Sequence, residues 1–410
     1  MKIIRAICRF AFGILFVLSG FLKAVDPVGT SLKIKEYFGV FHMDFLDFLS
    51  VPSGVLLTTA EFLVGVAILK GLRIQLFSKI ALGFISFFTL LTLWIAIANP
   101  VSDCGCFGEA IHLSNTGTFI KNLFLLVAAL VVFFQRKRFV PIAKPKVEWG
   151  YLSLYGVLLL SLQIYTLGNI PQIDFGIYKP GTDLIASQQS MQEREYETVL
   201  VYSKDGEEKE FNLENLPDST WTFVDARNIL VSGAEGDASS NLSFIDAQGN
   251  PSGDGILEAD GPVFLVSVYN AGRLDTTDVS RISVLADTLQ LKGVELYIVS
   301  SNSAEQTEEL FAGFEILYSD YKAVISLNRS NGGLTYINDG IVVKKWGRRS
   351  YPAAEIGKIL AEDPETITAT TQIDERLFAE ISLFVILFLI VIIRFFSKII
   401  YNARRPAATS

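Results

Sequence analysis

The chain has 410 residues, of which 50% are hydrophobic, and it carries a formal net charge of −8 at pH 7. Its mean hydropathy of +0.39 is too high for an ordinary soluble enzyme. No basic stripe with interleaved aromatic residues is present in the sequence, which argues against binding to nucleic acid.

Apolar residues are concentrated in stretches that are long enough to cross a membrane. A spanning helix needs roughly 20 mostly apolar residues to cross a hydrocarbon core about 30 Å thick. Six stretches with few charges meet or approach this length: 7–25, 51–70, 76–99, 118–135, 149–169 and 378–397. Because the long alternation expected of membrane strands is absent, we expect these stretches to form a helical bundle.

The distribution of lysine and arginine predicts which ends of these helices face the cytoplasm. Basic residues gather before the first stretch and after the second, fourth and sixth: Lys2, Arg5, Arg9, Lys70, Arg73, Lys79, Arg136, Lys137, Arg138, Lys144, Lys146, Lys398, Arg404 and Arg405. We therefore expect both termini in the cytoplasm and residues of about 170–376 outside it. The first stretch lacks a small-residue cleavage pattern and is expected to remain as an anchor.

After the fifth stretch the sequence changes to strand and helix patterns. Residues 171–241 begin with a proline-marked linker, and 196–213 predicts a β-hairpin around an Asp-Gly turn. From 242 to 362, strands and helices alternate in the order of a thioredoxin-like fold, which predicts a small α/β domain. We expect one of its strands in the segment SFIDAQGN, residues 243–250.

The predicted α/β domain lacks both chemical features of thioredoxin-like enzymes. Its first core strand, VFLVSVYN, is followed by AGRLDTT without a cysteine. The loop before its last hairpin, NRSNGG, has glycines where such folds hold a cis-proline. We therefore expect this domain to bind or dock a partner rather than to exchange thiols itself.

Two of the three cysteines lie close together in the outer loop DCGCFGEAIH, residues 103–112. A disulfide between Cys104 and Cys106 would close a small, strained ring, and strain makes a disulfide more oxidising and quicker to exchange. Gly105 and Gly108 would allow the backbone dihedrals that closure requires. A thiol pair at the outer membrane surface, facing an oxidising compartment, suits a redox relay.

Three interpretations of this loop remain open: redox exchange, a structural staple and a metal site. The ligands of a metal would come from Asp103, Cys104, Cys106, Glu109 and His112. Their spacing matches no familiar zinc finger, so we predict no metal. Asp103 and Glu109 would raise the pKa of the thiols by charge repulsion, and His112 could offset this effect if it lay close by.

Two ionisable residues of the predicted bundle are further candidates. Glu61 lies near the middle of the second stretch, where an ionisable side chain is costly and is by default a functional candidate. It could carry protons, bind a head group or quinone, or hydrogen-bond to Thr58, Thr59 or a neighbouring helix. Lys23 could extend to the outer surface and pair with Asp26.

The membrane unit resembles the DoxX/MauE group of small membrane proteins, particularly its MauE-like branch. The resemblance is carried by RFAFGILFVLSGFLKAVDP (9–27), AEFLVGVAILKG (60–71) and DCGCFG (103–108). It covers residues of about 1–140 and implies a four-helix bundle there. The whole architecture, with a cysteine-free thioredoxin-like domain and a closing helix, resembles a DoxX-family form found in Bacteroidetes.

The resemblance also implies a function. MauE-like proteins are thought to help form disulfides in methylamine dehydrogenase, and their bundle is similar in outline to vitamin K epoxide reductase and DsbB-type oxidases, which pass electrons from thiols to quinone. For this chain it implies an inner-membrane protein with a periplasmic domain, and quinone as a candidate electron acceptor. The exchanging pair would be Cys104 and Cys106. The supporting residues would be Asp103, Gly105, Phe107, Gly108, Glu109, His112, Glu61 and Lys23.

Two hypotheses of different kinds follow. The first is a membrane thiol–disulfide oxidoreductase, or an accessory to one, that supports disulfide formation in exported proteins. The second is a non-enzymatic scaffold whose outer domain binds an exported client or a periplasmic complex partner. The expected fold class is a membrane all-α bundle, a four-helix core plus two further spanning helices, with an inserted α/β thioredoxin-like extracytoplasmic domain. We expect a DoxX/MauE-like membrane domain at 1–140 and a fifth membrane helix at 147–170. A linker with a hairpin would follow at 171–241, then a degenerate thioredoxin-like domain at 242–362 and a closing membrane helix at 377–398.

Overall fold

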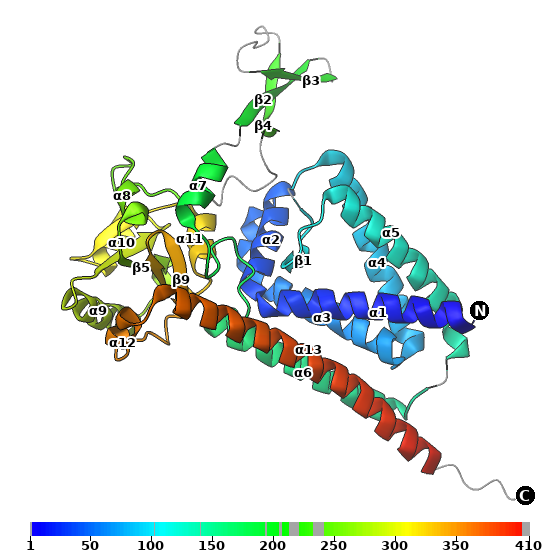
Figure 1. Ribbon diagram of the computed structural model, residues 1–410. Helices are drawn as coiled ribbons and strands as arrows, with labels where there is room; N and C mark the ends of the chain where they lie inside the picture. The colour runs from blue at the N-terminus through cyan, green and yellow to red at the C-terminus, as the bar shows by residue number, and fades with distance from the viewer. Residues whose placement is uncertain are drawn as a thin grey trace, which may run out of the picture.

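The computed structural model describes residues 2–101, 103–139, 141–192, 195–204, 207–212, 221–232 and 242–403. These residues form a helical bundle and an α/β domain, which lies beside one end of the bundle (Figure 1). A helix of 40 residues, α13 (Pro364–Ala403), leads away from the α/β domain to the C-terminal end of the chain.

Five helical segments of the described chain are long and apolar enough to cross a membrane. They are α1 (Lys2–Val25), η1 with α3 (Asp44–Leu49 and Ser50–Lys70), α4 (Ile74–Ala98), α5 (Asn115–Phe134) and α6 (Pro145–Gly168). They confirm the first five predicted stretches and a multi-pass membrane protein. The sixth stretch, 378–397, is helical within α13, and its crossing of the membrane remains a prediction.

The bundle is built on a close contact between α1 and α3. A Cβ atom added to Gly65 of α3 would lie 2.6 Å from the backbone nitrogen of Val17 in α1. Gly13 and Gly20 of α1 are equally tight, because an added Cβ would lie 2.7 Å from Leu69 and 2.8 Å from Phe62. Small residues at such positions let membrane helices approach closely and pack by van der Waals contact.

The outer part of the bundle carries a short helix and the cysteine loop. Helix α2 (Pro27–Val40) begins directly after α1, and the Asp26 carboxylate caps it by accepting a hydrogen bond from the Gly29 N–H. The short strand β1 (Cys106–Glu109) and α2 both pack against α1. A 3₁₀ turn, η2 (Arg136–Arg138), follows α5.

The α/β domain contains a mixed five-stranded sheet in the order β7-β6-β5-β8-β9. The strands are β5 (Pro262–Val268), β6 (Glu295–Ser300), β7 (Glu315–Tyr318), β8 (Gly333–Asn338) and β9 (Ile341–Trp346). The pairs β5–β6 and β6–β7 are parallel, whereas β8 is antiparallel to both β5 and β9. Each face of the sheet has its own apolar core, which explains why β5 is apolar along its length.

Short helices complete this domain: α8 (Asp254–Glu258), η4 (Ala271–Arg273), α9 (Thr276–Gln290), α10 (Ala304–Leu310), α11 (Tyr321–Leu327) and α12 (Ile356–Ala361). The α/β class is as predicted. The expected strand at 243–250 is wrong: Ile245 makes only isolated bridges to Pro251 and Tyr318, and the Asp246 side chain closes a tight turn.

Along the chain, α7 (Leu184–Gln192) and a separate three-stranded sheet in the order β3-β2-β4 come after the bundle and before this domain. Strands β2 (Glu195–Lys204) and β3 (Glu207–Asn212) pair antiparallel, as the hairpin prediction requires, and the predicted turn itself lies outside the described residues. Strand β4 (Thr222–Ser232) was not predicted, and it pairs with β2 on its other side.

We expect Gly65→Ala to destabilise the bundle by about 1–3 kcal/mol, because the added methyl group forces α1 and α3 apart. The matched control is Gly83→Ala in α4, where an added Cβ meets nothing within 4 Å. Thermal unfolding in detergent should show a clearly lower midpoint for Gly65→Ala. For Gly83→Ala the free energy of unfolding should change by no more than about 1 kcal/mol. Equal effects of the two substitutions would contradict this account of the packing.

Candidate functional site

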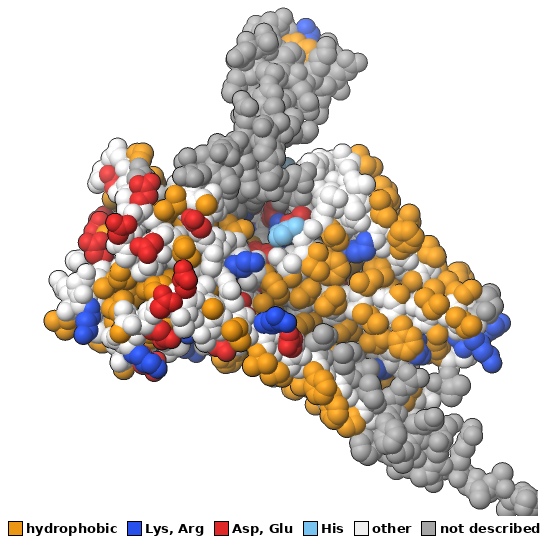
Figure 2. Space-filling model, in the orientation of Figure 1, with side chains coloured by type: hydrophobic (Ala, Val, Ile, Leu, Met, Phe, Trp, Pro, Cys, Tyr) orange, Lys and Arg blue, Asp and Glu red, His pale blue; other side chains and the backbone are white. Residues whose placement is uncertain are grey.

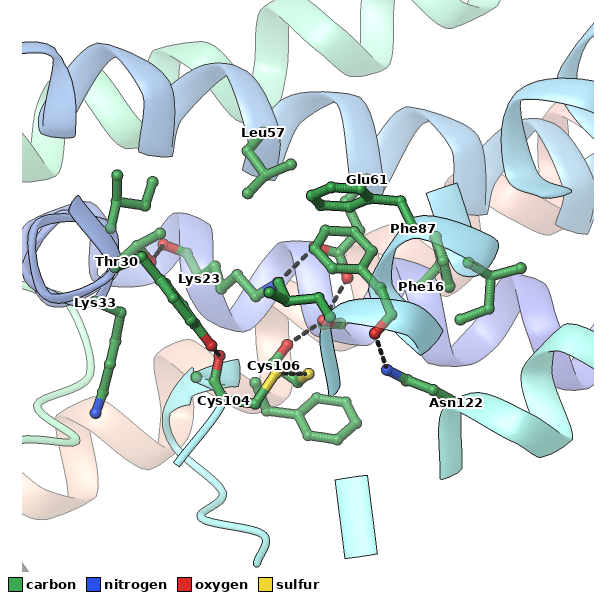
Figure 3. Close-up of a pocket in the computed structure, with 18 of the residues that line it drawn as sticks. Phe16, Lys23, Thr30, Lys33, Leu57, Glu61, Phe87, Cys104, Cys106 and Asn122 are labelled. Atoms are coloured by element: carbon green, nitrogen blue, oxygen red, sulfur yellow. Dashed lines mark hydrogen bonds and ion pairs between the residues drawn. The ribbon is translucent and has the colours of Figure 1, made fainter. Parts of the chain in front are cut away.

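The two cysteines of the outer loop face each other. The Cys104 and Cys106 sulfur atoms are 2.6 Å apart (Figure 3), close to the bonded distance of about 2.05 Å in a disulfide. Gly105 and Gly108 adopt φ angles of +63° and +62°, in the left-handed region that favours glycine. Both glycines therefore take backbone angles that most other residues avoid, and the loop brings the two sulfur atoms into contact.

Hydrogen bonds hold the main chain of the loop on both sides of the cysteine pair. The Tyr37 hydroxyl of α2 donates to the carbonyl oxygen of Cys104 at 3.2 Å. The Ser19 hydroxyl of α1 lies 2.5 Å from the carbonyl oxygen of Cys106. Both cysteines are half-buried and are fixed to two different helices of the bundle.

Asp103 organises the outer side of the loop. Its Oδ1 atom accepts a hydrogen bond from the Gly105 N–H at 2.7 Å and pairs with Lys33 at 3.4 Å. Its Oδ2 atom lies 2.8 Å from His112 Nδ1. Burial alone would raise the pKa of Asp103, but the His112 hydrogen bond, the Lys33 charge and the Gly105 N–H lower it to about 2.

His112 therefore contacts Asp103 rather than the thiols, and the hydrogen bond that His112 makes to the Asp103 carboxylate raises the pKa of His112. His112 was expected to offset charge repulsion at the thiols if it lay close to them, but its side chain contacts Asp103 instead. Asp103 in turn is neutralised by its own partners, so its expected repulsion of the thiols is offset. Carboxylates and a histidine gather where the α/β domain meets the bundle (Figure 2).

The two cysteines of the pair differ in pKa. The hydrogen bond between the two sulfur atoms lowers the pKa of Cys106 to about 7 and raises that of Cys104. Burial raises both pKa values, whereas the charges of Lys121 and Lys23 lower both. At neutral pH the pair is therefore poised to hold one negative charge, the form in which a thiol attacks a disulfide.

Lys23 and Glu61 form a buried ion pair beneath the loop, with Nζ and Oε2 2.5 Å apart (Figure 3). The expected pairing of Lys23 with Asp26 is wrong, because Lys23 turns inward to α3. Glu61 Oε1 also lies 2.6 Å from the Ser19 hydroxyl. Since Ser19 contacts the Cys106 carbonyl as well, a continuous chain of polar contacts joins Glu61 to the cysteine loop.

These residues line one cavity of about 490 Å³ within the outer half of the bundle. Its wall is mostly apolar and includes residues from α1 to α5, with Cys104, Gly105, Cys106 and Phe107 on one side. Phe41 and Phe87 line the cavity and are also 45% and 62% exposed, so the cavity reaches the lipid-facing surface. Figure 2 shows many hydrophobic side chains on the surface of the bundle in this view. The arrangement can admit a membrane-dissolved molecule to the thiols.

Several cavity residues were missed by the sequence analysis. They are Ser19, Lys33, Tyr37, Lys121 and Asn122. Lys121 lies within the apolar stretch 118–135, so the rule that singled out Glu61 would have found it too. The others are ordinary polar residues at helix ends or in helix interfaces, and nothing in their spacing marks them.

The remaining candidate, Glu109, joins the loop to the α/β domain. Arg329, between α11 and β8, is only 4% exposed; it forms an ion pair with Glu109 and lies 3.1 Å from Asp26. The two carboxylates raise the pKa of Arg329 although burial opposes them. A second ion pair joins Lys345 of β9 to Asp174 at 2.7 Å. The α/β domain is thus held against the end of the cysteine loop.

Within the described residues, no group of three or more His, Cys, Asp and Glu side chains could hold a metal ion.

Comparison with known families agrees with this description. Residues 1–135 match the family described as Methylamine utilisation protein MauE, and residues 196–233 match a Domain of unknown function (DUF8463). The first match covers about a third of the chain and includes the whole cavity wall, which supports a MauE/DoxX-like membrane family for this unit. No curated protein and no solved structure matches the chain.

Arg329→Met should leave Asp26 and Glu109 buried without a counter-charge, and removing one partner of a buried ion pair costs about 3–5 kcal/mol. We expect a lower thermal midpoint and faster protease cleavage between the α/β domain and the bundle. The control, Arg281→Met, removes a half-exposed arginine of α9 that pairs with Asp278 within its own helix. If both variants resist heat and protease equally, Arg329 does not hold the domain in place.

The His112–Asp103 contact should depend on pH. Because the pKa of His112 is raised above its ordinary value of 6.5, the contact stabilises the loop fully below that pH. Its effect is lost as the pH rises through the folded-state pKa, while Asp103 stays ionised throughout. The free energies of unfolding of wild type and His112→Gln should differ more at pH 6 than at pH 9. The difference should stay below about 1 kcal/mol, and thermal unfolding at the two pH values measures it. A larger difference at pH 9 would contradict this sign.

Proposed function

We propose that the protein is a membrane thiol–disulfide oxidoreductase, or an accessory to one, that supports disulfide formation in exported proteins. Cys104 and Cys106 are its exchanging pair. The observation that carries the proposal is the position of the two sulfur atoms, 2.6 Å apart in the wall of a cavity that reaches the lipid. A structural staple needs neither the cavity nor the buried charges around it.

The exchange with an exported protein is balanced in atoms and electrons. The disulfide of Cys104 and Cys106 is reduced to two thiols, and two client thiols become one disulfide, with two electrons and two protons passing to the loop. The low pKa of Cys106, about 7, favours the thiolate that leaves when the loop disulfide is attacked. Re-oxidation then requires an acceptor for two electrons and two protons.

A quinone, the acceptor that the family resemblance implies, fits the residues present. The cavity has apolar walls for a ring and an opening toward the lipid for a tail. The ammonium group of Lys23, which pairs with Glu61, supplies a nitrogen donor in the same wall. When bound, a quinone would supply the two-electron, two-proton acceptor that the thiol pair needs. The chain's own residues hold the loop at the cavity through Ser19 and Tyr37.

We also propose where the protein lies in the cell. Both termini would lie in the cytoplasm, and the α/β domain with the cysteine loop would lie in the periplasm of the inner membrane. The lysine and arginine distribution supports this orientation. The contacts of Arg329 with Asp26 and Glu109 require the loop and the α/β domain to be on one side of the membrane.

The second candidate is a non-enzymatic scaffold. The α/β domain contains no cysteine, and one of its loops lies against the cysteine loop through Arg329. We propose that this domain is thioredoxin-like, since its strand order β6-β5-β8-β9, with β5 and β6 parallel, suits such a fold. In this account it binds an exported client or a periplasmic complex partner and positions it at the membrane.

Replacing either Cys104 or Cys106 by serine should abolish disulfide formation that depends on this protein, without lowering its abundance. The matched control is Cys8→Ser, because Cys8 lies in α1 near the opposite end of the bundle. Alkylation gel shifts in intact cells should show the pair reduced by a pulse of reductant and re-oxidised only while quinone respiration runs. A pair that stays in one state would favour the scaffold, as would loss of function on deletion of 242–362 alone.

A further inference from the structure

Lys121 brings a positive charge into the cavity beside the thiol pair. It lies in the second turn of α5 and lines the cavity together with Cys104 and Cys106. Its ammonium group lies 4.5 Å above the ring of Phe107, the residue that follows Cys106. The side chain is half-buried among residues from a membrane helix and the cysteine loop.

The charge of Lys121 is not neutralised by a carboxylate, unlike the charges of the other lysines that line the cavity. Of the three lysines that line the cavity, Lys23 pairs with Glu61, and Lys33 pairs with Glu36 and Asp103. Lys121 forms no ion pair with any described residue, and its ammonium group instead makes a cation–π contact with Phe107. A cation in an apolar wall is costly, so such a residue is expected to meet a negative charge there.

The thiol pair can provide that negative charge. The charge of Lys121 lowers the pKa of both Cys104 and Cys106. Other charged or titratable groups line the same cavity as the sulfur atoms: Lys23 from α1, Lys33 and Tyr37 from α2, and Glu61 from α3. Because Lys23 is held by Glu61, its field at the sulfurs is partly cancelled, whereas that of Lys121 is not.

The proposed re-oxidation moves negative charge within reach of this ammonium group. Two S–H bonds break, one S–S bond forms, and the two electrons and two protons pass to an acceptor of the quinone class, which gains two O–H bonds. The thiol pair carries a negative charge on sulfur when it reacts, and a bound quinone would supply oxygen atoms that take up the electrons and protons. A fixed cation beside the pair lowers the energy of such negative charge.

We propose that Lys121 is the positioning residue of the thiol pair: its ammonium group stabilises the Cys106 thiolate and the charge that develops on the acceptor in the cavity. This inference rests on the proposed function for the acceptor, but its effect on the thiolate does not depend on the acceptor's identity.

The test is the pH dependence of Cys106 alkylation in the reduced full-length protein, followed by mass spectrometry. Lys121→Met should slow alkylation at pH 7 by roughly three- to tenfold, since loss of a nearby opposite charge raises a thiol pKa. At high pH, where both proteins hold a thiolate, the rates should converge. Lys121→Arg, which keeps the charge, should restore the wild-type profile.

The matched control is Lys35→Met, which removes a lysine of α2 that pairs with Asp47 and does not line the cavity. Its profile should superimpose on that of wild type. A Lys121→Met profile that also superimposes on wild type would overturn the inference, even if the pair cycles in cells. A shifted profile in a pair that does not cycle would support the role of Lys121 and reject the proposed function.

Discussion

The ion pair of Lys23 and Glu61 is the interaction on which the site depends. Both groups are almost fully buried, 8% and 6% exposed, within a bundle of apolar helices. Neither charge could remain there alone, because an unpaired ion in such surroundings is strongly destabilising. Their pairing fixes α1 against α3 where Gly20 already allows close approach, and it orients the Glu61 oxygen that Ser19 contacts.

The cysteine loop is held between this pair and the α/β domain. On the membrane side, Ser19 reaches the Cys106 carbonyl, so the loop is tied to the buried charges. On the outer side, Glu109 at the end of β1 meets Arg329. Only two residues separate Cys106 from Glu109, and movement of the loop on disulfide formation would therefore act on both contacts. The thiols face a cavity that opens toward lipid, whereas their outer side lies beneath Asp103 and His112.

Much of this could be predicted from the sequence, because it depends on local patterns. Runs of about 20 apolar residues are sufficient to locate five helices, and the Cys-Gly-Cys loop and Glu61 stand out by composition. The partner of Lys23 was predicted wrongly from sequence proximity. Asp26 instead caps α2 and contacts Arg329, which is 303 positions away along the chain. Contacts at such separation depend on how two domains meet, and no local pattern encodes them.

The central claim is that the cavity brings an acceptor to the thiols of Cys104 and Cys106. The most direct test mixes the reduced, detergent-solubilised protein with a short-tailed quinone and follows quinol formation together with the free-thiol count. The account predicts one quinol formed and two thiols lost per chain, with no reaction in the Cys104→Ser variant. Thiols that persist in the presence of excess quinone would contradict it.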